Sequence, residues 1–205
     1  MPRSSLNGKA EVSDPPRKGV IRMIAGGPAG GDSQRARKAK IREAYGTIIK
    51  EVIDVEPAED TPLIQFGQEE QCGPRTQGND ALVIIDLLAN YEIERVFIDS
   101  DSSADILIGE AYDQMQLGDV PLDTVDTSLY GFAGEVVQPR GMISLPLTLG
   151  TTPLRTTCLL KFLVVDILSA YNVILGRPTL NAFQAVISTY HMKIKFLVIG
   201  GVGEA

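Results

Sequence analysis

Short apolar runs separated by turn residues dominate the chain from residue 80 onward. Runs of this length at close spacing are typical of the strands of a small β-barrel or sandwich. The pattern therefore predicts an all-β domain over residues 80–198, interrupted by only two helices, at 103–116 and at 178–183. The runs expected to form strands are residues 81–89, 95–98, 127–132, 136–150, 158–165, 172–175, 185–188 and 192–198.

The residues before this region differ in composition and in their pattern of apolar positions. Residues 1–18 are polar and contain prolines, so we expect a disordered tail. Residues 19–56 are predicted to form a short strand at 20–25 and an amphipathic helix, whose apolar stripe would bury against the domain, a neighbouring segment or a partner. Residues 57–79 are expected to be a linker and residues 199–205 a flexible C-terminus. The helical stripe consists of Ile41, Ala44, Tyr45, Ile48, Ile49, Val52 and Ile53.

Composition limits the number of domains and the class of partner. A chain of 205 residues, 44% hydrophobic and 22% charged, can bury one core but leaves no room for a second enzyme domain. Residues 1–60 carry eleven Lys and Arg against nine Asp and Glu, whereas residues 61–205 carry eight against seventeen. Because phosphate contacts need clustered cations, we expect no direct nucleic-acid binding by the acidic C-terminal part.

Neither a membrane span nor a metal centre is expected. The longest apolar stretch, residues 159–175, is broken by Lys161, Asp166 and Asn172, which suits core strands better than a span. Cys72 and Cys158 are too few for a disulfide framework and lack metal-ligand spacing, which favours a reducing compartment. No apolar run near the N-terminus could serve as a secretory signal. We therefore expect a cytoplasmic protein that uses no metal or other cofactor.

The clearest candidate chemistry lies in residues 96–107. An apolar strand runs directly into Asp99-Ser100-Asp101-Ser102, which presents carboxylates and hydroxyls at the end of a buried strand. One interpretation is an Asp-x-Asp-x-Ser phosphotransfer loop, in which one Asp is the nucleophile and both acids help to hold magnesium. That chemistry also needs a downstream Lys and further acids, and no such set is apparent in the sequence. The other interpretation is an aspartic-protease loop.

Three motifs favour the protease interpretation. They are residues 97–107, which include the catalytic Asp-Ser-Gly position, residues 129–134 (Leu-Tyr-Gly-Phe-Ala-Gly) and residues 171–181 (Tyr-Asn-Val-Ile-Leu-Gly-Arg-Pro-Thr-Leu-Asn). With these motifs, residues 80–198 resemble the retropepsin-like aspartic protease of plant gypsy-type retrotransposon gag-pol polyproteins. Residues 20–60 resemble the segment that precedes this protease. The resemblance implies a closed-barrel acid-protease fold and an aspartic endopeptidase that cuts the retroelement polyprotein.

The resemblance also implies a catalytic arrangement. Each domain would supply one catalytic acid, Asp99, so two copies must form a homodimer. The paired carboxylates would share a proton, one activating water and the other acting as acid toward the scissile carbonyl. Ser100 would tie the two loops together, and Ser102 belongs to the same loop. Residues implied to form the flap are Leu129, Tyr130, Gly131, Phe132, Ala133 and Gly134, although an ordinary hairpin turn is equally compatible with them. Residues implied to support the loop are Ile174, Leu175 and Gly176.

One residue departs from the motif, because Asp101 stands where the family has glycine. Glycine would permit a tight turn, leave room for a substrate strand and aim its amide at the catalytic carboxylate. Asp101 is expected to restrict φ and to crowd four acids into the site of a dimer. We therefore expect weak or absent cleavage. The alternatives are a dimerising remnant without catalytic activity and the metal-dependent phosphotransfer loop.

Overall fold

The computed structural model describes residues 18–21, 62–70, 80–118, 120–131 and 135–205. Strands predominate in these ranges, and the helical elements are short. The strands are β1 (Gly19–Ile21), β2 (Val83–Leu88), β3 (Tyr91–Ile98), β4 (Asp105–Ile108), β5 (Leu129–Tyr130), β6 (Val136–Val137), β7 (Gly141–Thr151), β8 (Leu154–Val165), β9 (Val173–Leu175), β10 (Val186–Ser188), β11 (Lys193–Val198) and β12 (Gly201–Glu204). The helical elements are the 3-10 turn η1 (Gln68–Glu70), α2 (Gly109–Met115) and α3 (Arg177–Ala182).

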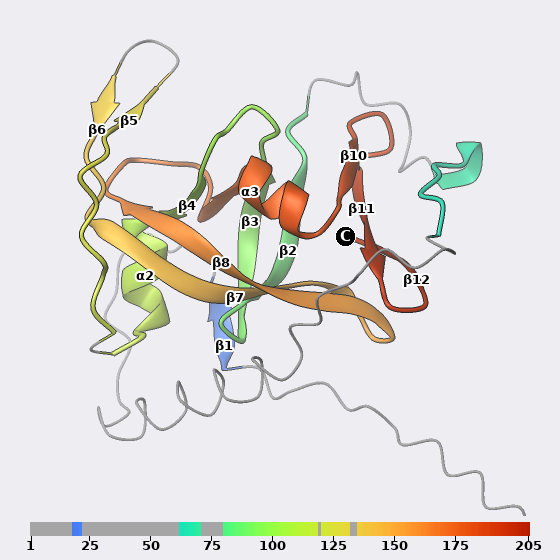
Figure 1. Cartoon of the computed structure of the whole chain (residues 1–205), viewed down its shortest axis with the longest axis horizontal. Helices are drawn as coiled ribbons and strands as arrows, with labels where there is room; N and C mark the ends of the chain where they lie inside the picture. Colours follow the sequence, from blue (N-terminus) through green and yellow to red (C-terminus); the bar gives the residue numbers. More distant parts are fainter. Residues whose placement is uncertain (1–17, 22–61, 71–79, 119, 132–134) are drawn as a thin grey trace, which may run out of the picture.

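Six strands close into a barrel (Figure 1). Their hydrogen-bonded order is β3-β2-β7-β8-β4-β9, and β9 pairs again with β3 to complete the ring. The β7–β8 hairpin forms one long antiparallel side, while β3–β9 and β4–β8 pair in parallel. The expected all-β, closed-barrel class with short helices is therefore confirmed. The amphipathic helix and the tail expected before it lie outside the described residues.

Period-two alternation explains how the barrel buries its core. Along β7, Ile143, Leu145, Leu147 and Leu149 are each at most 2% exposed. Successive side chains of a strand point to opposite faces, so these four share the inner face with the apolar residues of the other strands. Hydrophobic burial of such a set is the main force that holds a small barrel together.

The helix expected over residues 103–116 is wrong in its first half. Residues Asp105–Ile108 form β4, and only Gly109–Met115 are helical. A short apolar run such as Ile106-Leu107-Ile108 fits a strand or a helix equally well by its pattern alone. Here β4 has strand partners on both sides, β8 and β9, and pairing with them decides the outcome.

The C-terminal residues form a small antiparallel sheet. Helix α3 confirms the short helix expected over residues 178–183, and the sheet β10-β11-β12 follows it. Residues 199–205 were expected to be flexible, but they contain β12, which pairs with β11. The end is fixed further by two backbone hydrogen bonds between Ile194 and Ala205, of 3.1 and 3.0 Å. The glycines of β12 give this strand too weak an apolar pattern for it to be recognised from the sequence.

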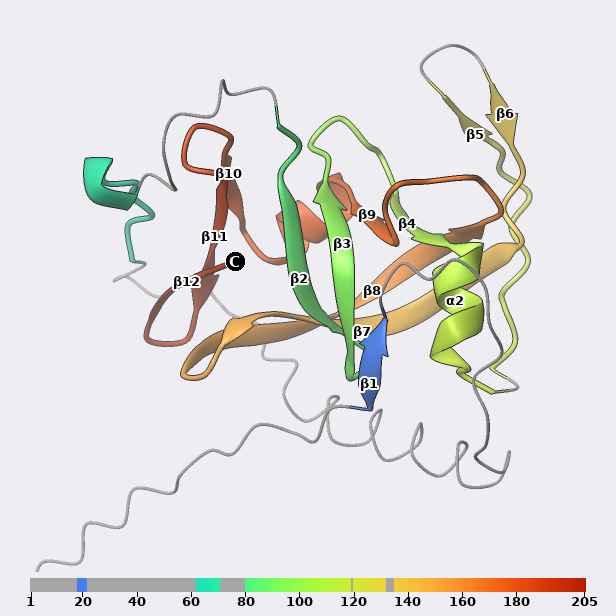
Figure 2. The ribbon, with the colours of Figure 1, turned by 180° about the vertical axis from the view of Figure 1, so that it is seen from behind.

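Two upstream segments also contact the domain. Strand β1 lies parallel to β3 (Figure 2), within the region where a strand is expected, and its Ile21 is 6% exposed in the core. Residues 62–70 lie in the region expected to be a linker, yet they contact the C-terminal sheet at Lys195. The folded unit therefore extends upstream of residue 80.

Candidate functional site

Asp99 lies directly after β3, at the point where two parallel strands end together. The register places Ile98 beside Leu175, the last residue of β9. The Asp99 amide donates to the Leu175 carbonyl at 2.9 Å, and the Ile98 amide donates to the Leu82 carbonyl at 3.0 Å. Asp99 is half-buried, while Ser100 and Asp101 are exposed. A rigid strand end thus presents a carboxylate that solvent can still reach.

The turn after Asp99 is closed by hydrogen bonds to Asp99 itself. The Asp101 amide donates to Asp99 Oδ1 at 3.0 Å, and the Ser102 amide donates to the Asp99 carbonyl at 3.3 Å. An Asp side chain that accepts from the amide two residues later is a common way to stabilise such a turn. Asp101 is not among the described non-glycine residues with positive φ. Residue 101 therefore does not adopt the left-handed conformation that favours glycine.

Ser102 and Gly176 join this loop to the start of α3. The Ser102 hydroxyl donates to the Ala104 carbonyl at 2.7 Å, and the Arg177 amide donates to the Ser102 carbonyl at 3.0 Å. A Cβ on Gly176 would lie 2.5 Å from the Ala104 carbonyl oxygen and 2.8 Å from that of Ser102. Any side chain at this position would therefore push the Asp99 loop away from its support.

Asp105 is a buried acid beneath the same loop, and the sequence analysis missed it. It is 1% exposed, and its Oδ1 accepts a 2.7 Å hydrogen bond from the Gly176 amide. Its Oδ2 and the nearby Thr179 hydroxyl are buried, and neither makes a hydrogen bond of acceptable geometry among the described residues. Burial raises the pKa of Asp105, and the contacts with Gly176 and Thr179 oppose that rise. The sequence carries one signal for this residue, because Asp105 is an acid at the start of the apolar run Ile106-Leu107-Ile108.

A continuous apolar row runs around the barrel beside Asp99. Residues directly opposed on neighbouring strands point to the same side of a sheet. The register from β2 around to β7 places six such residues in one row: Val83, Phe97, Ile174, Ile106, Leu163 and Met142. All six are partly exposed, whereas the residues on either side of each along the chain are buried. The Tyr171 ring stacks on Phe97, with centroids 4.7 Å apart.

The segment expected to form the flap contains a β-hairpin. β5 and β6 pair through Leu129 with Val137 and Tyr130 with Val136, and the Gly131 amide donates to the Glu135 carbonyl at 2.8 Å. Figures 1 and 2 show this hairpin projecting from one end of the molecule, opposite the C-terminal sheet. Tyr130 is 77% exposed and Val136 61%. The remaining expected flap residues, Phe132, Ala133 and Gly134, lie outside the described residues.

Arg140 connects the base of this hairpin to two other elements. It forms ion pairs with Asp113 of α2 at 2.8 Å and with Asp166, just after β8, at 2.5 Å. The two carboxylates raise the pKa of the Arg140 guanidinium. A Cβ on Gly109 would meet the Asp166 carboxylate, so that side chain would have to move. Arg140 lies between β6 and β7. Its ion pairs join this part of the chain to α2 and to the loop after β8, which also contains Tyr171.

The described ranges contain no group of three or more His, Cys, Asp or Glu side chains placed to hold a metal ion. Within the same ranges, no helix has the length and apolar character needed to cross a membrane.

The chain was compared with known families, curated proteins and solved structures. No family model matches it, and no curated protein matches it. Among solved structures it is similar to EIAV protease complexed with the inhibitor HBY-793, with 20% identity, a TM-score of 0.39, and coverage of 56% of this chain and 99% of that one. It is also similar to the retroviral protease-like domain of Ddi1 from Leishmania major, with 19% identity, a TM-score of 0.43, and coverage of 57% and 90%.

Proposed function

We propose that the chain contains the retropepsin-like aspartic protease domain of a retroelement polyprotein, of the plant gypsy type that its motifs resemble. The observation that carries the proposal is the placement of Asp99. Its carboxylate stands at the end of a core strand, accepts the amide of residue 101, and rests on a loop supported by Gly176. A fixed and accessible carboxylate of this kind is what hydrolysis by a paired acid requires.

The proposed reaction needs two copies of the chain. Each domain contributes Asp99, and the two carboxylates would face each other across a two-fold axis. Two acids this close cannot both ionise easily, so they share one proton. The ionised carboxylate would take a proton from a bound water, while the protonated one would give its proton to the scissile carbonyl oxygen. Ser100, exposed at the tip of the loop, would contribute hydrogen bonds between the two loops.

The apolar row supplies the binding floor for the proposed substrate. An extended polypeptide could lie along it and bury alternate side chains, while its backbone runs past Asp99. The stacked rings of Phe97 and Tyr171 would contact the peptide on one side of the apolar row. The β5–β6 hairpin would act as the flap that closes over the peptide and excludes water. We therefore expect cleavage between apolar residues of a polypeptide.

Asp101 would weaken this activity through its charge. The turn accommodates residue 101 without positive φ, so geometry alone does not oppose catalysis. Its exposed side chain would nevertheless bring a second pair of acids to the dimer centre, where like charges repel. The runner-up function follows from the same observation, and it is a domain that folds and dimerises but does not cleave.

A cleavage assay separates these possibilities. The purified chain is incubated with peptides containing apolar pairs at mildly acidic pH, with and without a transition-state-mimicking aspartic-protease inhibitor. The proposal expects slow cleavage that the inhibitor blocks. Dimerisation without cleavage would support the remnant instead. Magnesium-dependent release of phosphate from an added phosphoester, with no requirement for a dimer, would point to the phosphotransfer loop.

A further inference from the structure

Lys195 is a buried cation on the outer face of the C-terminal sheet. Along β11, Ile194, Phe196 and Val198 point into the core, so Lys195 points the other way. A lysine on an outer face normally keeps its ammonium in water. Lys195 is instead 8% exposed. Something on this face must therefore cover it and satisfy its charge.

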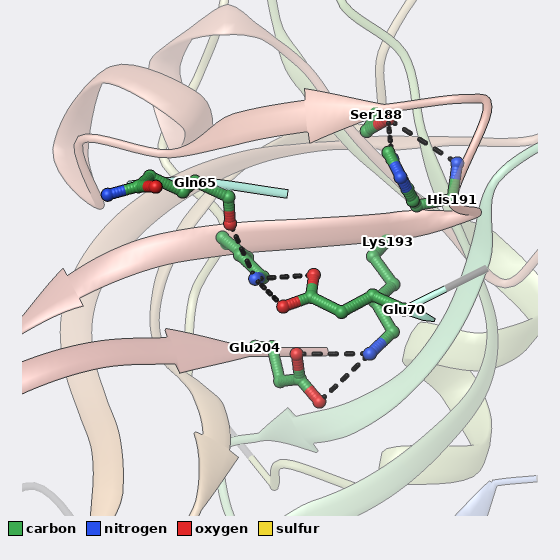
Figure 3. Close-up of polar contacts among 7 residues, drawn as sticks. Gln65, Glu70, Ser188, His191, Lys193 and Glu204 are labelled. Carbon is green, nitrogen blue, oxygen red and sulfur yellow. Dashed lines mark hydrogen bonds and ion pairs between the residues drawn. The ribbon is translucent and has the colours of Figure 1, made fainter. Parts of the chain in front are cut away.

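Residues 62–70 provide that cover (Figure 3). The Glu70 carboxylate binds the Lys195 ammonium through both oxygens, at 2.7 and 2.6 Å. The Gln65 carbonyl accepts a third hydrogen bond from it, at 2.7 Å. The Phe66 ring lies 4.9 Å from the same nitrogen, in a cation–π arrangement. These partners come from a segment more than 120 residues away along the chain.

Phe66 makes a second contact, with the turn that leads into β11. Its ring stacks on His191, with centroids 5.2 Å apart and planes 16° apart. His191 is held in turn by Ser188, whose hydroxyl lies 2.7 Å from Nδ1. The aromatic ring and the carboxylate of residues 62–70 thus engage two separate features of the sheet, an imidazole and an ammonium.

A neighbouring ion pair shows that this contact is unlike an ordinary surface pair. Lys193 lies two residues away on the same face and pairs with Glu204 at 3.1 Å, with side chains 23% and 54% exposed. The corresponding values for Lys195 and Glu70 are 9% and 28%, at 2.6 Å. Exposed pairs contribute little to stability. In the Lys195–Glu70 pair the ammonium is buried and the carboxylate is partly exposed, so removing Glu70 would leave a buried charge without its partner.

We propose that the outer face of β10-β11-β12 is a peptide-docking site whose ligand is residues 62–70 of the same chain. The site recognises an aromatic ring followed four residues later by a carboxylate, Phe66 and Glu70. This proposal does not rest on the protease function. It implies that the functional unit begins upstream of residue 62, and that a cut within residues 71–79 would leave the docked segment bound.

A competition experiment on the full chain tests the site. A labelled peptide with the sequence of residues 62–70 is titrated into the parent chain and into the double variant Phe66→Ala/Glu70→Ala, whose own segment is disabled. We expect saturable binding, one peptide per chain, to the variant and at least about tenfold weaker binding to the parent, whose site is occupied. Adding Lys195→Met to the variant should abolish binding, and adding Glu204→Gln should not.

Several results would overturn the proposal. Equal binding to the parent and to the variant would show that the peptide uses another surface, and binding to neither would show that there is no docking site. A parent chain whose residues 62–70 hold a second copy together would sediment as a dimer that Glu70→Ala dissociates, and this would refute docking within one chain.

Hydrogen exchange on single variants keeps the test independent of how the double variant folds. We expect Lys195→Met to accelerate exchange in residues 62–70 by about tenfold or more, and to leave β7 unchanged. Glu204→Gln serves as the matched control and should leave both regions unchanged. Unchanged exchange in residues 62–70 after Lys195→Met would refute the proposal that Lys195 holds this segment on the sheet.

Discussion

The Asp99 loop at the end of a barrel strand and the Lys195 site on the C-terminal sheet each carry an ionisable side chain, but the surroundings of the two side chains differ. Asp99 is half-buried, and its carboxylate accepts the amide of Asp101. Lys195 is buried, and it is bound by a carboxylate, a carbonyl and an aromatic ring. A charge whose neighbours already satisfy it can hold a structure together, whereas an accessible one remains free to react. The contrast is consistent with the two proposals, in which the first site carries out chemistry and the second holds residues 62–70 on the sheet.

The largest expected effect is on catalysis at the first site. Asp99→Asn removes the ionisable oxygen but keeps the size of the side chain and its ability to accept the Asp101 amide. If the protease proposal holds, peptide cleavage should fall by about 1000-fold, because the acid–base pair is broken. Chromatographic analysis of the peptide products measures it, and the melting temperature should barely change. Residual cleavage at the parent rate would assign the activity to another group or to a contaminant.

The next effect concerns a third ionisable side chain, Asp86, which is buried like Lys195 but has fewer hydrogen-bond partners. Asp86 lies at a bulge in β2 and is 7% exposed, and its Oδ2 has no hydrogen-bond partner among the described residues. Burial raises the pKa of Asp86 from 3.8 to about 7, against the effect of the Leu87 and Gly150 amides.

Because the folded state holds this proton more tightly than the unfolded state, Asp86 favours folding at low pH and less so as the pH rises. Stability should therefore fall by up to about 4 kcal/mol between about pH 4 and pH 7. Asp86→Asn should remove most of that slope. Urea unfolding at several pH values measures it. An unchanged slope in the variant would mean that other groups set the pH dependence.

A smaller effect compares two lysines on one strand face. Lys195→Met removes the ammonium that joins Glu70, the Gln65 carbonyl and the Phe66 ring to the sheet, and it should lower the melting temperature by about 5 °C. Lys193→Met disrupts only the exposed pair with Glu204 and should lower it by no more than about 1 °C. Thermal melts of the two variants at equal concentration decide the matter. Equal shifts would remove the distinction drawn between the two sites.

The smallest effect concerns Asp101. Asp101→Gly restores the glycine of the motif and removes one acid per chain from the proposed dimer centre. Cleavage at mildly acidic pH should increase by about tenfold, because like-charge crowding is relieved. Asp123→Gly, which removes an exposed acid near the start of β7, is a control for the loss of net charge. No gain over the parent would refute the explanation based on charge.

The sequence predicted the barrel well because its signal is local. Alternation in runs such as β7 follows directly from which side chains face the core, and Asp99 stands out because an apolar strand meets an acid. β4 was mistaken for a helix because an apolar run of that length fits both periods, and only its partners β8 and β9 decide between them. The sequence carries no comparable signal for the partners of residues that act through distant contacts.

Lys195 and Asp105 are the two such residues that matter most. Lys195 depends on Glu70, 125 residues away, and Asp105 depends on Gly176, 71 residues away. Neither partner can be inferred from local spacing. The sequence also does not reveal that the turn uses the amide of residue 101 without requiring a positive φ there.

The central claim is that Asp99 works as one half of a pair, and the most direct measurement is sedimentation of the purified chain over a range of concentrations. Cleavage should be assayed on the same samples, using Asp101→Gly beside the parent. The account predicts a monomer–dimer equilibrium, with activity per chain that rises in step with the dimer fraction. A chain that stays monomeric at every concentration, or one whose activity per chain does not change with dilution into the monomer, would contradict it.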